Sequence, residues 1–137
     1  MNQLAVFDMK CKCPSYNIAF KINHRTKKVY LSKVAHDFKR DLKMATPHLD
    51  MKKVKYLLFN IDVMQDWFYK NGKLKRQDVQ NMDKLIIDAV CDKLGVDDSI
   101  VIQSSIQKIQ YVGDPYIVIM LYSEDEIPME EYDEQAN

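Results

Sequence analysis

The chain has 137 residues, which suits a single domain, and its side chains are 47% hydrophobic and 29% charged, as in globular proteins. Its 20 basic and 20 acidic residues cancel to a formal net charge of zero, which by itself gives no sign of a nucleic-acid or membrane partner. No apolar run approaches the roughly 20 residues of a membrane span. The first residues lack the basic and apolar regions of a signal peptide. We therefore expect a cytoplasmic protein.

The charges are unevenly placed along the chain. Residues 1–123 hold all 20 basic residues and 13 of the acidic ones, a net charge of +7, whereas residues 124–137 hold seven acidic residues and no basic one. A segment so polar buries too little apolar surface to fold by itself. We expect one basic folded domain over residues 1–123 and a disordered acidic tail over residues 124–137.

The cysteines are few and odd in number. Cys11 and Cys13 have no second ligand pair at zinc-finger spacing, and His24, His36 and His48 are scattered. We expect reduced thiols rather than a zinc site.

The first third of the chain predicts strands, where apolar and β-branched residues alternate or cluster, at residues 2–10, 18–22 and 28–31. Pro14 to Asn17 is a turn or loop. Ser32 is a typical N-cap. Apolar residues at helical spacing follow it until Pro47, which predicts a helix between these two positions.

Residues 54–63 are rich in β-branched and aromatic side chains and predict another strand. A basic loop follows, and residues 78–94 then predict the clearest helix, with Gly95 at the expected C-terminal position. Two further strands are predicted at residues 100–111 and 116–122. Because strands and helices alternate only in part, we expect an α+β fold, a mixed β-sheet with two main helices packed on one face.

The helix predicted at residues 78–94 has an apolar side and a polar side. Asn81, Lys84 and Asp88 share the polar side, and Asp78 stands at the helix N-terminus, where free N–H groups favour a carboxylate. Taken singly, these residues have ordinary explanations, since Asp78 suits an N-cap and Lys84 with Asp88 suits an i,i+4 pair.

Two further carboxylates, Asp97 and Asp98, follow Gly95. They suit a simple loop, but if this loop folds back beside the helix, several carboxylates converge. Converging carboxylates are costly unless they hold a hard divalent ion. Mg²⁺ or Mn²⁺ in such a site would activate water and neutralise charge on a phosphate.

Two clusters of basic residues suit contact with DNA phosphates. Each cluster alone is more typical of a solvated surface. Tyr16, Tyr30 and the run Trp67-Phe68-Tyr69 lie among them and suit stacking on unpaired bases, although Trp67 and Phe68 equally suit the core or a dimer interface. The clusters are Lys21, Arg25, Lys27 and Lys28 in the first, and Lys70, Lys73, Lys75 and Arg76 in the second.

The pattern that starts at Arg76 resembles the RusA-like family of Holliday junction resolvases. It reads Arg76-x-Asp78-x-x-Asn81-x-x-Lys84-x-x-x-Asp88-Ala89, then Gly95 and Asp97-Asp98. The family's core is Asp-x-Asp-Asn-x-x-Lys-x-x-x-Asp-Ala-Leu, then Gly and an Asp-Asp pair. Pro14-Ser15-x-Asn17 and the basic stretch from Arg25 to Ser32 resemble the family's first turn and its basic hairpin, so the resemblance spans residues 14–122.

This resemblance implies a small homodimeric endonuclease, often encoded by a phage or prophage, that binds four-way DNA junctions. The family cuts two strands symmetrically with Mg²⁺ or Mn²⁺. By position, Asp78 and Asp98 match catalytic aspartates, Lys84 the essential lysine, Asn81 the motif asparagine and Asp88 the helix aspartate. The DNA-contacting residues would be Arg25, Lys27, Lys28, Lys73, Lys75 and Arg76.

Gln80 departs from the pattern, because the family usually has a second aspartate there. A neutral amide oxygen can reach a metal but adds no negative charge, so Asp88 and Asp97 would have to complete the carboxylate set. The alternative is a non-catalytic protein that binds branched DNA. A third possibility is an interaction module whose acidic tail binds a basic partner.

Overall fold

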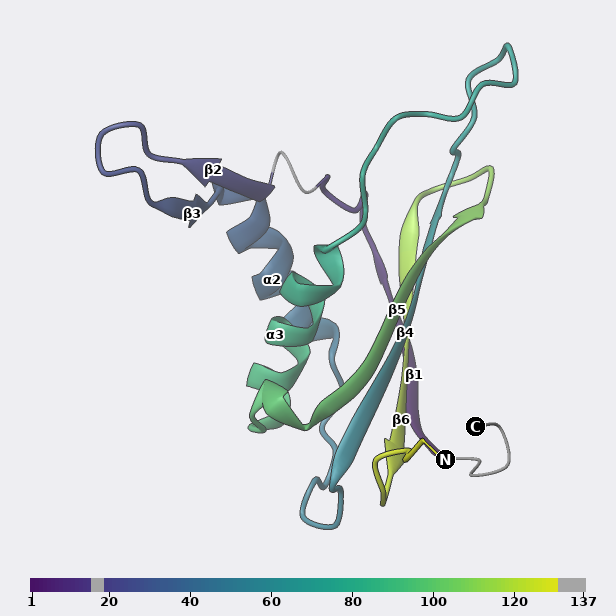
Figure 1. Ribbon diagram of the computed structural model, residues 1–137. Coiled ribbons are helices and arrows are strands. Elements are labelled where there is room, and N and C mark those ends of the chain that lie inside the picture. Colours follow the sequence, from purple (N-terminus) through teal and green to yellow (C-terminus); the bar gives the residue numbers. More distant parts are fainter. Residues whose placement is uncertain (16–18, 131–137) are drawn as a thin grey trace, which may run out of the picture.

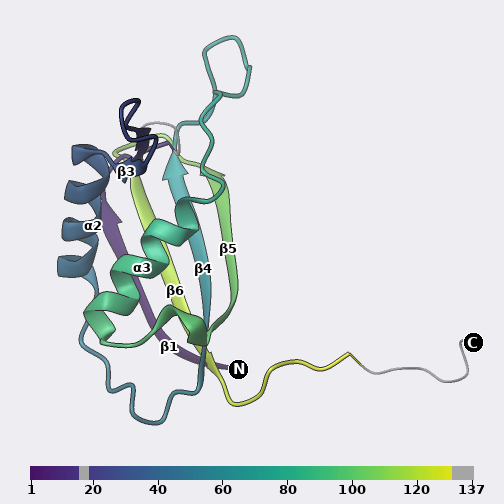
Figure 2. The same ribbon diagram turned by 60° about the vertical axis from the view of Figure 1, so that its left-hand side comes forward.

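The computed structural model describes residues 1–15 and 19–130. Within these residues the chain forms, in order, β1 (Asn2–Lys10), β2 (Phe20–Ile22), β3 (Val29–Leu31), α2 (Lys33–Ala45), β4 (Tyr56–Gln65), α3 (Met82–Leu94), the 3₁₀ turn η1 (Asp98–Ile100), β5 (Val101–Gln110) and β6 (Tyr116–Glu124). The predicted α+β fold is confirmed, with a mixed sheet and both helices on one face of it (Figures 1 and 2). In this described part, no helix is long and apolar enough to cross a membrane.

The main sheet has the strand order β1-β6-β4-β5. β6 pairs antiparallel with β1 and with β4, whereas β4 and β5 run parallel. A tight turn cannot join two parallel neighbours, so the chain must return from the end of β4 to the start of β5 by a long connection. That connection holds α3, and it places the helix directly before the edge strand β5.

The core lies between the sheet and the two helices (Figure 2). Along β4 every second side chain, from Leu57 through Phe59 and Ile61 to Val63, is buried on the helix side. This alternation is the period of a strand with one face against a core. The buried residues that join them from β6 and α3 are Ile117, Ile119, Leu121, Met82, Ile86, Ala89 and Val90.

The opposite face of the sheet carries no helix (Figure 1). Hydrogen bonds between neighbouring strands cross it, from the Ser105 hydroxyl to Asn60 Oδ1 at 2.8 Å and from Gln107 Nε2 to Asp62 Oδ1 at 2.7 Å. Val6 of β1 lies opposite Met120 of β6 and is half-exposed. This face is therefore mixed in character, polar over β4 and β5 and more apolar over β1 and β6.

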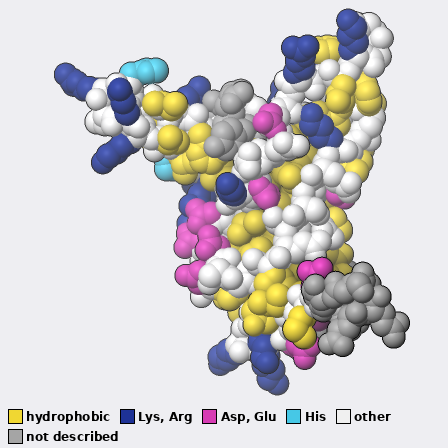
Figure 3. All heavy atoms as spheres, viewed as in Figure 1, with side chains coloured by type: hydrophobic (Ala, Val, Ile, Leu, Met, Phe, Trp, Pro, Cys, Tyr) yellow, Lys and Arg dark blue, Asp and Glu magenta, His cyan; other side chains and the backbone are white. Residues whose placement is uncertain are grey.

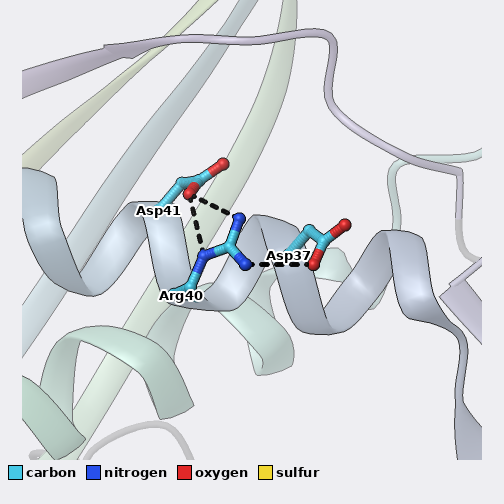
Figure 4. A network of polar contacts seen from close by, with 3 residues as sticks. All are labelled: Asp37, Arg40 and Asp41. Carbon is cyan, nitrogen blue, oxygen red and sulfur yellow. Dashed lines mark hydrogen bonds and ion pairs between the residues drawn. The ribbon is translucent and has the colours of Figure 1, made fainter.

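Helix α2 begins as predicted at Ser32, whose hydroxyl accepts a hydrogen bond from the Ala35 backbone N–H at 3.2 Å. On its outer face the Arg40 guanidinium lies between the carboxylates of Asp37 and Asp41, each 3.3 Å away (Figure 4). The basic side chains of α2 are therefore largely neutralised within the fold, because ion pairs also link Lys39 to Asp88 and Lys43 to Asp92 of α3.

Helix α3 begins at Met82 and not at residue 78, so the prediction of Asp78 as its N-cap is wrong. Asn81 holds the capping position in the left-handed region, with φ 68°, and its side chain makes no capping hydrogen bond. Asp78 instead accepts a hydrogen bond from the Gln80 backbone N–H at 2.8 Å, which closes a local turn. The C-terminal prediction is confirmed, because Gly95 adopts φ 71° and closes the helix.

Helical spacing misplaced the start of α3 because tertiary contacts hold the residues before it. Gln77 Nε2 donates to the Cys13 carbonyl at 2.6 Å, and Gln65 Nε2 donates to Gln77 Oε1 at 3.0 Å. The side chain of Val79 is buried in the core. These contacts draw residues 77–79 along the sheet and delay the helix until Met82.

Strand β6 runs through Glu124, one residue past the predicted domain boundary at residue 123. Residues 125–130 form neither helix nor strand. The expected disorder of the tail falls largely on residues 131–137, which lie outside the described residues, as do Tyr16, Asn17 and Ile18. The division into residues 1–123 and 124–137 stays a prediction.

Candidate active site

Two arms project from the same end of the molecule, one from each side (Figure 1). The hairpin arm comprises residues 20–31, with β2 and β3 paired antiparallel. Its tip is closed by Asn23, whose Oδ1 accepts from the Arg25 and Thr26 backbone N–H groups at 2.9 and 3.3 Å. The second arm, which we call the ribbon, comprises residues 66–75. Its two segments meet in an isolated antiparallel bridge between Phe68 and Leu74.

Lysine and arginine side chains gather at the ends of both arms, on either side of a broad hollow (Figure 3). The hairpin arm carries the predicted DNA-contacting residues Arg25, Lys27 and Lys28. The ribbon and the residue after it carry Lys73, Lys75 and Arg76. Among the described residues, none of these six cations is in an ion pair, in contrast to those of α2. Unpaired cations on projecting arms suit phosphate contacts on both sides of one DNA molecule.

A surface pocket of about 490 Å³ lies between the first turn of α3 and the start of β5. Lys84 and Asp98, two of the predicted catalytic residues, both line it. Asp83 also lines it, and its Oδ2 accepts a hydrogen bond from the Ser104 hydroxyl at 2.8 Å. The crossover from β4 to β5 therefore brings a lysine and two carboxylates into one pocket.

Asp83 was missed in the sequence, although it directly precedes Lys84. The helical spacing placed Asn81, Lys84 and Asp88 on one polar side, and Asp83 fell outside that set. Its contact with Ser104 comes from β5, twenty-one residues further on. Only the docking of α3 against β5 makes this pairing visible.

Asp78 lies apart from that pocket, at the base of the ribbon. It lines a pocket of about 420 Å³ with Leu74, Lys75, Arg76 and Lys108. A neighbouring pocket of about 310 Å³ is lined by Asp78, Gln80 and Lys108 among others. Asp78 and Gln80 are thus neighbours, and Lys108 of β5 adds a cation beside them that the sequence did not indicate.

The other two predicted ligands make different contacts. Asp88 is ion-paired with Lys39 of α2. Asp97 caps η1, where its Oδ1 accepts from the Ser99 backbone N–H at 2.8 Å. Hydrogen bonds from the Ser99 backbone and hydroxyl hold the pKa of the Asp97 carboxyl below its usual range. The Asp88 carboxylate therefore links α3 to α2, and the Asp97 carboxylate stabilises the turn η1.

The expected convergence of several carboxylates is not what the structure contains. In residues 1–15 and 19–130, no three histidine, cysteine or acidic side chains are grouped so that they could hold a metal ion. The carboxylates of Asp83 and Asp98 do share a pocket with the oxygen-bearing side chains of Gln103 and Ser104. One or two carboxylates, completed by waters and substrate phosphates, are a usual setting for Mg²⁺. The donor chemistry of this pocket fits Mg²⁺ or Mn²⁺.

The aromatic run behaves as two separate groups. Trp67 is buried, and its Nε1 donates to the Val63 carbonyl at 3.1 Å, so the core alternative is correct for this residue. Phe68 and Tyr69 are exposed on the ribbon. Trp67 is therefore not placed to stack on a base.

The family model described as Endodeoxyribonuclease RusA matches residues 14–122 of the chain. This match covers both arms, both helices and the crossover from β4 to β5. The chain belongs to the RusA family. Its membership implies an endodeoxyribonuclease, a hydrolase of DNA phosphodiester bonds that acts on branched DNA in recombination. No curated protein matches the chain.

The thiol of Cys91, near the C-terminal end of α3, has a raised pKa in this RusA-family protein. Burial raises the pKa of the Cys91 thiol to about 11, and the charges of Asp98, Asp88 and Asp97 add to the rise. Burial also raises the pKa of Cys11 to about 11 and that of Cys13 to about 12. All three thiols are free and hold their protons at neutral pH.

We predict that the three thiols resist iodoacetamide at pH 8 in the folded protein, because the thiolate is the reactive form. In urea all three should react, as peptide masses would show.

Unfolded thiols lose their protons near pH 9 and folded ones only at about 11 or above, so stability should fall as the pH rises through this window. Asp98→Asn should lower the pKa of Cys91 and leave that of Cys13 unchanged. Folded Cys91 that reacts at pH 8 as fast as in urea would contradict the assignment.

Proposed function

We propose that this RusA-family protein resolves four-way DNA junctions by paired symmetric nicks, in a reaction that requires Mg²⁺ or Mn²⁺. The observation that carries the proposal is the pocket that Lys84 and Asp98 share between α3 and β5. The two arms, whose cations are in no ion pair among the described residues, add a basic surface to the same domain (Figure 3). The resemblance described above adds the expectation that the protein is encoded by a phage or prophage, and its place in the cytoplasm stays a prediction from the sequence.

In this proposal the arms bind the DNA backbone on both sides of the branch point. Lys84 contacts the scissile phosphate, and its ammonium group stabilises the negative charge that builds up there during hydrolysis. Asp98 and Asp83 hold the divalent ion, which would supply an activated water and neutralise charge on the phosphate. Asn81, exposed at the start of α3, orients the phosphate or a carboxylate. Asp97 and Asp88 support this arrangement through η1 and through Lys39.

Gln80 supplies no negative charge beside Asp78, so this part of the site binds a metal more weakly than a pair of aspartates would. We propose that Asp78 still serves as a ligand when DNA is bound, with Lys108 and Arg76 beside it on the phosphate. If Gln80 has abolished cutting, the same arms would leave a protein that binds branched DNA without cleaving it.

Two symmetric nicks require two active sites, and we propose that a second copy of the chain supplies the other one. The face of the sheet opposite the helices supports this idea, because it is uncovered in the described structure and carries Val6 and Met120 side by side. Covering exposed apolar side chains is the main driving force for association.

We predict that the wild-type protein cuts two opposed strands of a synthetic four-way junction when Mg²⁺ or Mn²⁺ is present, and that EDTA stops it. Lys84→Ala and Asp98→Asn should each reduce the cutting rate about 100-fold or more, because the first removes the cation that acts on the reacting phosphate and the second removes a charge that would hold the divalent ion. Asp83→Asn and Asp78→Asn should also slow cutting, and Gln80→Asp should accelerate it. Product strands resolved on a denaturing gel measure each rate.

Asp92→Asn is the matched control, because Asp92 is an α3 carboxylate that pairs with Lys43 away from the pocket. It should cut at the wild-type rate. Tight junction binding with no nicks in any metal would exclude the enzyme and favour the non-catalytic alternative. Equal binding of junction and duplex would exclude both.

We predict that junction affinity falls steeply with salt, because phosphate contacts release counterions. Arg25→Ala, Lys27→Ala and Lys28→Ala should each make the plot of log K against log[salt] less steep, reducing the magnitude of its negative slope by about 1, as expected for one lost phosphate contact. Lys52→Ala, on an exposed loop before β4 and away from both arms, should leave the slope unchanged. Fluorescence anisotropy at several salt concentrations gives the slopes, and a flat response of the wild type would rule out binding through the arms.

We predict that light scattering gives a mass about twice the 16.1 kDa of the chain. Val6→Lys should shift the protein toward monomer, because it places a charge on the uncovered face of the sheet. Val34→Lys changes a similarly exposed valine on α2 and should leave the dimer intact. A wild-type protein that stays monomeric at working concentrations would overturn the dimer.

A further inference from the structure

The ribbon is built as a rigid projection. The Lys75 backbone N–H donates to the Trp67 carbonyl at 2.6 Å, and the Tyr69 N–H donates to the Lys73 carbonyl at 2.8 Å. Gly72 closes the tip with φ 84°, a conformation that glycine adopts without strain. Backbone hydrogen bonds therefore join the two segments of the ribbon on both sides of the Phe68–Leu74 bridge.

Its base is fixed in the core. The buried side chain of Trp67 is hydrogen-bonded to β4 through the Val63 carbonyl. Gln110, at the end of β5, is hydrogen-bonded to both Asp66 and Trp67 at the base of the ribbon. Its Oε1 accepts from the Trp67 backbone N–H at 2.8 Å, and its Nε2 donates to Asp66 Oδ1 at 2.9 Å. A base held by β4 and β5 keeps the ribbon at a set angle to the sheet.

Beyond this base the ribbon exposes large apolar side chains. Phe68, Tyr69 and Leu74 are 43%, 55% and 53% exposed, whereas Trp67 is 1% exposed. Clustered exposed apolar groups on a projecting segment mark a contact surface more often than they serve stability. The ribbon thus contributes one aromatic ring to the fold and offers two to the outside.

The exposed groups are divided between the two faces of the ribbon. Phe68 and Leu74 are bridge partners, so their side chains share one face. Tyr69 and Lys75 share the other, with Lys75 Nζ 5.7 Å from the centre of the Tyr69 ring. The result is a thin wedge with an apolar face and an aromatic face flanked by an ammonium group.

The charge of the ribbon indicates the partner. The ribbon, residues 66–75, has three lysines and one acidic residue, Asp66 at its base, and Arg76 follows it directly. A second copy of this chain would bring like charges together at such a surface. A polyanion with flat apolar groups inside it, which describes the stacked bases of DNA, matches both the cations and the rings.

The position of the ribbon indicates which part of the DNA it meets. Leu74 lines the same pocket as Asp78, so the apolar face of the wedge borders one of the proposed metal ligands, although not the pocket of Lys84 and Asp98. An intact duplex keeps its bases stacked. At a branch point strands change partners and stacking is interrupted, so a side chain can enter there at lower cost.

We propose that the ribbon inserts Phe68 and Tyr69 between the bases at the branch point, and that this contact distinguishes a junction from a duplex. The inference rests on the proposed function, because it assumes that the arms bind branched DNA. Phosphate contacts by the lysines strengthen binding to either DNA form and carry no information about branching. The aromatic contacts add affinity only for DNA whose bases can separate to admit a ring.

The experiment compares junction and duplex binding in EDTA, so that no strand is cut, with 2-aminopurine next to the branch point as a reporter of stacking. Wild-type protein should change the 2-aminopurine emission when it binds. Phe68→Ala should lower junction affinity about tenfold, leave duplex affinity unchanged and weaken the emission change, and Tyr69→Ala should do the same. Tyr69→Phe keeps the ring and should behave as wild type.

Two controls separate stacking from charge and from general apolar exposure. Lys70→Ala with Lys73→Ala should weaken junction and duplex binding by the same factor. Met44→Ala removes an exposed apolar side chain on α2 and should change neither. Emission of the single tryptophan, Trp67, together with a thermal melt, checks that the base of the ribbon is intact in every variant.

The outcomes separate the two proposals. If the wild-type protein binds junction and duplex equally, the proposed function fails. If it prefers and cuts junctions but Phe68→Ala and Tyr69→Ala keep that preference and the emission change, only the ribbon inference is overturned. It is also overturned if these variants turn a dimer into a monomer, since the ribbon would then be a contact between copies.

Discussion

The parallel pairing of β4 with β5 is the constraint on which the candidate site depends. Parallel neighbours need a connection that spans the sheet, and here that connection supplies the ribbon, the turn at Asp78 and the helix α3 in succession. Because α3 then packs beside β5, Asp83 meets Ser104 and Lys84 shares a pocket with Asp98. An antiparallel β5 would follow β4 through a short turn, and none of these residues would be brought together.

The same connection also carries the contacts that override local preference. Gln77 is hydrogen-bonded to Cys13, from the other end of the chain, and to Gln65 at the end of β4. These bonds hold the segment before α3 outside the helix, and Asn81, in a left-handed conformation, precedes the first helical residue. Asp78 is consequently at the base of the ribbon beside Arg76 and Lys108, and not on the first turn of a helix.

The fold decides which basic residues are paired with carboxylates and which are not. Basic residues on α2 meet acidic partners on α2 and α3, as Arg40 does between Asp37 and Asp41 (Figure 4). Such exposed pairs add little stability, but they remove these cations from competition for DNA. The cations of the arms are in no ion pair in the described chain, so positive charge gathers at the ends of both arms, and a further basic group lies at the opposite end of the molecule (Figure 3).

The sequence by itself determined the α+β class, the helix that Ser32 begins, the end of α3 at Gly95 and the family, because these depend on local periodicity, capping residues and a motif of fixed spacing. It also predicted the two basic segments that form the arms, and it singled out Lys84 and Asp98, which line one pocket. Tertiary structure alone decided that α3 begins at Met82, that Asp88 pairs with Lys39, that Trp67 is buried while Phe68 is exposed, and that Asp83 belongs to the pocket. Each of these depends on contacts between segments far apart in the chain, and helical or strand periodicity carries no information about which distant segment a side chain will meet.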